Sequence, residues 1–92
     1  MLHGRANGMP PLHPNMRRSE WTQSLSKAYD MLVNEIRNHE KTAINEYAAT
    51  NPAEYFAVIS ETFFTAPKLI KQHNPEVYKQ LVLFYKQEPT GI

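Results

Sequence analysis

The sequence predicts an all-α fold of about four helices after an irregular segment, and three observations support this prediction. Apolar residues recur at spacings of three and four between residues 21 and 36, which is the period of an amphipathic helix. Asn-Pro pairs at 51–52 and 74–75 each place a favourable N-cap directly before a proline at the first helical position. No segment alternates apolar and polar residues as a half-buried strand does.

The N-terminal segment, residues 1–18, is predicted to be an irregular loop. It contains three of the seven prolines and two of the three glycines. Proline fixes φ and removes an N–H donor, so it disfavours a regular element here. We therefore expect residues 1–18 to form a Pro/Gly-rich loop and residues 19–92 to form one helical subdomain. The apolar fraction of 41% is sufficient for a folded core.

The first helix is expected to begin at Ser19 as N-cap, with Glu20 in the positive first turn. It should end between Asn38 and Lys41. One face is apolar and is expected to be buried; it consists of Trp21, Leu25, Tyr29, Leu32, Val33 and Ile36.

The second helix is expected to run from Pro52 to about Phe64, after a connection over residues 42–51. Its apolar residues surround most of its circumference: Tyr55, Phe56, Ala57, Val58, Ile59, Phe63 and Phe64. A helix that is apolar on most sides is typical of a central, buried position. A chain of 92 residues has little other material to cover such a helix, so we expect exposed apolar surface and self-association.

Two further helices complete the predicted fold. The third begins at Pro67, with Leu69 and Ile70 as its apolar contacts. The fourth begins at Pro75 after an Asn74 cap and ends near Gln87. Its buried side is expected to consist of Val77, Tyr78, Leu81, Leu83, Phe84 and Tyr85.

Composition excludes several classes of function. Ten basic residues balance nine acidic ones, which gives no reason to expect a nucleic-acid or anionic-membrane partner. The absence of cysteine excludes disulfides, thiolate zinc sites and thiol nucleophiles. There is no apolar signal segment at the start and no apolar run of about 20 residues that could span a bilayer. We therefore expect a cytoplasmic location.

Two carboxylates, Glu54 and Glu61, are seven residues apart on the second helix and therefore lie within about 20° of the same face. A buried carboxylate needs a hydrogen bond, an ion pair or a metal. Structural explanations remain open for both residues and for the nearby Tyr47. Glu54 can complete a capping box with Asn51, Glu61 can be a polar position at a boundary, and Tyr47 can be a core aromatic with a bonded hydroxyl.

The string Tyr-Ala-Ala-Thr-Asn-Pro-Ala-Glu-Tyr-Phe-Ala-Val-Ile-Ser-Glu-Thr-Phe-Phe over residues 47–64 resembles the C-terminal part of the Mlc titration factor A family. These proteins are glucose-regulated zinc metallopeptidases of the gluzincin type, similar to the protease domain of anthrax lethal factor. The resemblance extends over essentially the whole chain. It implies that the helices correspond to the C-terminal helical subdomain of an α+β zincin-like peptidase, which removes N-terminal residues from peptides.

The resemblance also implies roles for three residues. Glu54 matches the third zinc ligand, which acts beside the two histidines of HExxH. Tyr47 matches the phenol that donates a hydrogen bond to the oxyanion, and Glu61 matches a supporting carboxylate near the site. HExxH itself does not occur in the sequence: His39-Glu40 begins like it, but position 43 is alanine. The chain therefore reads as a truncated part of a peptidase, expected to bind no zinc and to be inactive alone.

The other histidines do not provide a zinc site, since His3, His13 and His73 lack a second ligand at metal spacing. Two further hypotheses remain open. The chain can be a non-catalytic helical module that binds a protein, for example the transcriptional repressor Mlc. Alternatively, a separate polypeptide can supply the HExxH helix in trans.

Overall fold

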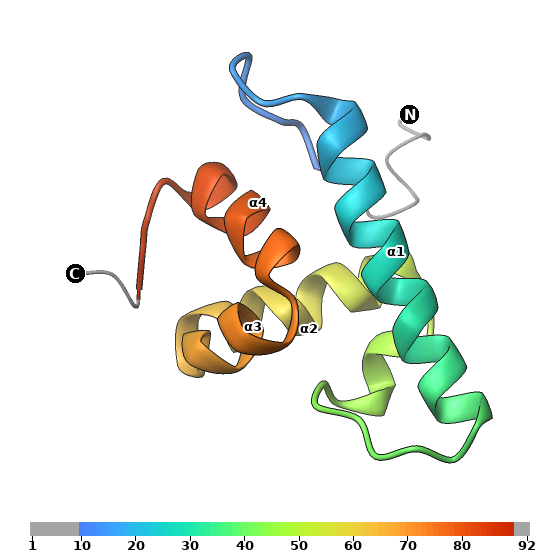
Figure 1. The fold of residues 1–92 in the computed structure, drawn as a ribbon. Helices are drawn as coiled ribbons and strands as arrows, with labels where there is room; N and C mark the ends of the chain where they lie inside the picture. The colour runs from blue at the N-terminus through green and yellow to red at the C-terminus, as the bar shows by residue number, and fades with distance from the viewer. Residues whose placement is uncertain (1–9, 90–92) are drawn as a thin grey trace.

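The computed structural model describes residues 10–89, and within this range the fold is all-α, as predicted. Four α-helices and one short 3-10 helix follow each other along the chain, and no strand occurs among the described residues (Figure 1). The elements are α1 (Arg18–Arg37), η2 (Glu46–Ala49), α2 (Pro52–Thr65), α3 (Pro67–His73) and α4 (Pro75–Tyr85). The first half of the predicted loop, including His3, lies outside the described residues.

Helix α1 has the predicted apolar face, but it begins earlier than predicted. Trp21 and Leu32 are buried, and the N-cap is Arg17 rather than Ser19. The Trp21 N–H donates to the Arg17 carbonyl at 3.1 Å. The preceding turn, closed by a 2.9 Å bond from Met16 N–H to the His13 carbonyl, fixes where the chain enters the helix.

The start of α2 agrees with the sequence prediction. Asn51 has an extended backbone, and its side-chain oxygen accepts the Glu54 N–H at 2.8 Å. Pro52 follows as the first helical residue. Asn74 occupies the same position before α4, but its side chain forms no capping hydrogen bond. Helix α4 ends at Tyr85, slightly before the predicted end, because Lys86 adopts the left-handed conformation with φ 56°.

The core lies where the four helices meet. Helix α2 begins behind α1 and runs across to α3 (Figure 1), and it contacts η2, α3 and α4, while α1 contacts α4 and η2. The largest fully buried side chains come from all four helices: Trp21, Ile59, Phe63, Ile70, Val77 and Leu81. None of the described helices is long and apolar enough to cross a membrane.

Helix α2 packs into the core but keeps apolar surface accessible, as expected for a chain with little other material to cover it. Tyr55, Ile59 and Phe63 are buried, but Ala57 is exposed and Phe64 keeps 46% of its surface accessible. The molecule measures 39 × 38 × 19 Å, a slab about two helix diameters thick. The described helices therefore leave one strip of α2 accessible, which includes Ala57, Glu61 and Phe64.

Two leucines also differ from their predicted burial. Leu69 on α3 is 38% exposed and Leu83 on α4 is 46% exposed. Leu69 directly precedes the fully buried Ile70, and Leu83 follows the fully buried Leu81 by two residues in α4. Each leucine therefore lies on the outer side of its helix.

Replacing Tyr55 with phenylalanine is expected to stabilise the chain. The residue is 2% exposed, and its hydroxyl is buried without a hydrogen-bond partner among the described residues. An unsatisfied buried hydroxyl costs about 1–3 kcal/mol, so urea unfolding should show a gain of up to that size. Tyr85→Phe is the matched control, because its hydroxyl bonds the Ser60 hydroxyl at 2.8 Å and its loss should destabilise.

The same substitution is expected to change the alkaline pH dependence of stability. Burial raises the pKa of the Tyr55 hydroxyl above its ordinary value of about 10. A raised folded-state pKa contributes stability that is present below pH 10 and is lost as the pH rises further. Tyr55→Phe should therefore lose less unfolding free energy than the parent chain between about pH 10 and 12. Equal losses of unfolding free energy in both proteins would contradict a raised pKa of the Tyr55 hydroxyl.

Candidate functional site

Tyr47 lies on the short helix η2 and faces outward. Its N–H donates to the side-chain oxygen of Asn45 at 2.8 Å, which begins the 3-10 turn. The next residue, Ala48, is fully buried and anchors the turn to the core. The Tyr47 side chain is 57% exposed, so its interpretation as a core aromatic is wrong. Helix η2 was not predicted from the sequence, although Asn45 is a typical residue for starting such a turn.

Glu54 is the third residue of α2, in its positive first turn. Its side chain is partly exposed, and within the described residues its carboxylate forms no hydrogen bond or ion pair. Only one half of the predicted capping box is present, the bond from Glu54 N–H to Asn51 at 2.8 Å. The carboxylate is therefore available to a group outside the described residues.

Glu61 lies on the same side of α2 as Glu54. It is exposed, as a polar position at a boundary would be. Helical geometry places Ile59 about 140° and Phe63 about 180° around the axis from Glu54, and both are fully buried. The two carboxylates thus lie on the face of α2 that is opposite to the core.

Tyr29 of α1, predicted only as part of an apolar face, contacts this region. The Tyr29 hydroxyl donates to the Ala49 carbonyl of η2 at 3.1 Å. Its ring meets the Tyr55 ring edge-on, with centroids 5.7 Å apart and an interplanar angle of 80°. No local sequence signal identifies this contact, because the partners are 20 residues apart.

The comparison with known families decides the identity of the chain. The family model described as Glucose-regulated metallo-peptidase M90 matches residues 1–86. The chain belongs to this family. Three relatives are all named Mlc titration factor A. That of Serratia proteamaculans is 42% identical over 90 residues, 96% of this chain and 34% of the relative.

The other two relatives give the same result. The Yersinia pestis protein is 43% identical over 91 residues, 96% of this chain and 33% of the relative. The Edwardsiella ictaluri protein is 40% identical over 88 residues, 94% of this chain and 33% of the relative. The chain thus spans about one third of the length of the relatives. The predicted resemblance is therefore confirmed at the level of the family.

Membership of a metallo-peptidase family raises the question of which residues could hold a metal. Among the described residues, no group of three His, Cys, Asp or Glu side chains could hold an ion. His13 contacts the Phe84 carbonyl through Nε2 at 2.7 Å, whereas His39 and His73 are exposed at the ends of α1 and α3. The free carboxylate of Glu54 suits one ligand position, and the remaining ligands would lie outside the described residues.

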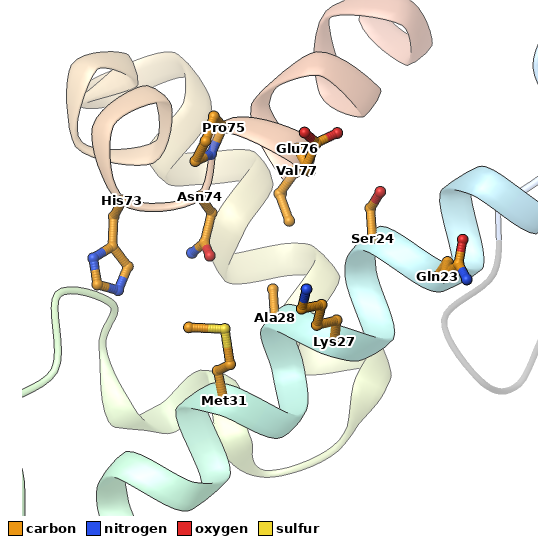
Figure 2. Close-up of a pocket in the computed structure, with 10 residues that line it drawn as sticks. All are labelled: Gln23, Ser24, Lys27, Ala28, Met31, His73, Asn74, Pro75, Glu76 and Val77. Atoms are coloured by element: carbon orange, nitrogen blue, oxygen red, sulfur yellow. The ribbon is translucent and has the colours of Figure 1, made fainter.

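A groove of about 500 Å³ between α1 and the α3–α4 turn does not include the candidate site (Figure 2). Lys27 and Met31 line it from α1, and His73 and Val77 line it from the other side. None of the three predicted site residues contributes to it. In this M90 family member, the candidate ligand therefore lies on an accessible helix face and outside this groove.

Proposed function

We propose that this chain is the helical part of a zinc-dependent peptidase and supplies one zinc ligand, Glu54, together with Tyr47. The observation that supports this most strongly is the carboxylate of Glu54, which is partly exposed and without a partner among the described residues. Catalytic zinc is held by about three protein ligands and keeps one position open. A free carboxylate at the start of a well-packed helix is suited to be one of those ligands.

The roles of the two residues differ. A zinc ion in such a site activates a water molecule and polarises the substrate carbonyl. Glu54 would contribute negative charge and hold the ion. The phenol of Tyr47, which is 57% exposed, would donate a hydrogen bond to the oxygen of the scissile carbonyl, where charge develops in the transition state. The substrates would be peptides with a free N-terminus.

The two imidazoles and the general base would come from polypeptide outside these 92 residues, because HExxH does not occur in the sequence. That polypeptide would cover the open face of α2, where Glu61 and Phe64 are exposed. The relatives, about three times as long as the matched region, have enough chain for this. Glu61 would then bond a group of the covering part and support the site.

The decisive experiment uses a chimera, in which this chain replaces the matching third of Mlc titration factor A from Serratia proteamaculans. We expect the purified chimera to contain zinc and to release p-nitroaniline from an aminoacyl p-nitroanilide. The 92-residue chain alone should neither contain zinc nor release p-nitroaniline. Metal content is measured by mass spectrometry and activity by absorbance. A zinc-free, inactive chimera that is correctly folded would contradict the proposal.

In this chimera, Tyr47→Phe is expected to lower kcat by about 100- to 1000-fold, the cost of removing an oxyanion hydrogen-bond donor. The zinc content should stay unchanged because the phenol is not proposed as a ligand. Tyr85→Phe is the control, since it removes a hydroxyl that bonds Ser60 away from η2. A Tyr47→Phe variant as active as this control would exclude the assigned role.

A second candidate function is binding of the repressor Mlc, and the name of the three relatives, Mlc titration factor A, favours it. We expect immobilised 92-residue chain to retain purified Mlc, and Glu54→Gln to retain it equally, because binding through the helical surface requires no zinc ligand. Absence of retention by both the chain and the chimera would remove this candidate.

A further inference from the structure

One side chain of α1 touches both halves of the candidate site. The Tyr29 hydroxyl donates to the Ala49 carbonyl at 3.1 Å, and Ala49 is in the same short helix as Tyr47. The Tyr29 ring packs on Tyr55 at 5.7 Å, the residue that directly follows Glu54. We infer that Tyr29 is a positioning residue that fixes the η2 turn relative to the first turn of α2, and so fixes Tyr47 relative to Glu54. The catalytic meaning of this inference rests on the proposed function.

The local hydrogen bonds stabilise η2 and α2 individually and do not join one helix to the other. Asn45 caps η2 through the Tyr47 N–H at 2.8 Å, and Asn51 caps α2 through the Glu54 N–H at 2.8 Å. Only two residues separate the elements, and Asn51 there is fully extended, with φ −167° and ψ 169°. No bond among these local ones joins the two elements.

Tyr29 adds a connection from α1 to the direct packing between η2 and α2. Within the described residues, its bond to Ala49 is the hydrogen bond that ties η2 to another helix. Ala48 adds an apolar anchor because it is fully buried, but a methyl group does not fix the direction of a turn. The hydrogen bond and the edge-on ring contact together fix it, since both come from one tyrosine on the long helix α1.

The first test compares two variants of the 92-residue chain by amide hydrogen exchange measured with NMR. Tyr29→Phe keeps the ring contact and removes the hydroxyl. Tyr85→Phe is the matched control, since it removes a hydroxyl bond of 2.8 Å between α4 and Ser60 of α2 that is part-buried, like the Tyr29 bond. We expect the Ala48 and Thr50 amides, which are hydrogen-bonded within the turn, to exchange about fivefold faster in Tyr29→Phe only.

The pattern of exchange decides this test. Faster exchange confined to the η2 amides is the expected result for a local tether. A uniform acceleration in all four helices, or the same change in both variants, would overturn the inference, because that is the behaviour of a plain loss of stability.

The second test measures kcat and KM of the chimera and of its variants. Tyr29→Phe is expected to lower kcat about tenfold with KM nearly unchanged, because a displacement of catalytic groups by less than 1 Å reduces the rate strongly. Tyr85→Phe should leave both constants unchanged. If Tyr47→Phe and Glu54→Gln lose activity while Tyr29→Phe behaves like Tyr85→Phe, the inference alone fails. If Tyr47→Phe and Glu54→Gln stay active, the proposed function fails, whatever the exchange data show about the tether.

Discussion

Replacing Glu54 with glutamine in the chimera is expected to remove most of the bound zinc and to lower kcat/KM by more than about 100-fold. Loss of groups that only support a metal ligand already costs about 10- to 100-fold, and a neutral amide is a much poorer zinc ligand than a carboxylate. The effect should appear both in the zinc content and in the rate of anilide hydrolysis.

The control for this prediction is Glu20→Gln. Glu20 occupies the same place in α1 as Glu54 in α2, the third helical residue after the N-cap. Each substitution should therefore cost a similar helix-dipole contribution of about 0.3–1 kcal/mol. Glu20→Gln should keep zinc and activity, so a common loss in both variants would point to stability rather than to metal binding. Full zinc content and full activity in Glu54→Gln would refute the ligand assignment.

Replacing Phe63 with alanine is expected to unfold the 92-residue chain at 25 °C. Phe63 is fully buried, and its ring packs against Tyr78 at 5.5 Å and Tyr85 at 5.7 Å. Truncation of a buried phenylalanine costs about 3–5 kcal/mol. A domain of this length has only a few kcal/mol of total stability. Far-ultraviolet circular dichroism and urea unfolding measure the loss.

The neighbouring Phe64 provides the matched control, because the same chemical change is made one residue away at a position that is 46% exposed. Phe64→Ala should lower the unfolding free energy clearly less than Phe63→Ala, by about 1–2 kcal/mol, because the half-exposed ring still contacts Phe63 and Tyr85. It should also reduce self-association of the isolated chain, since it removes exposed apolar surface from the open face of α2. Equal destabilisation by both substitutions would show that the burial pattern of α2 is wrong.

The local elements of the fold were predictable because their signals lie within a few residues. The apolar spacing of α1 and the Asn51-Pro52 start of α2 follow from backbone and capping chemistry. The string around Glu54 predicted the family, which the match over residues 1–86 confirms. The start of α1 was misplaced because Ser19 has the right chemistry, whereas the turn from His13 to Met16 sets the geometry.

The sequence by itself determined the four α-helices, their order and the common face of Glu54 and Glu61, because helical periodicity is a property of the chain alone. Only the tertiary structure decided that this face lies opposite to the core. An apolar residue such as Phe64 has the same sequence signal as Phe63, and only the neighbouring helices leave one accessible and the other buried. The contact from Tyr29 to η2 was likewise decided by packing, since it joins residues that no local pattern relates.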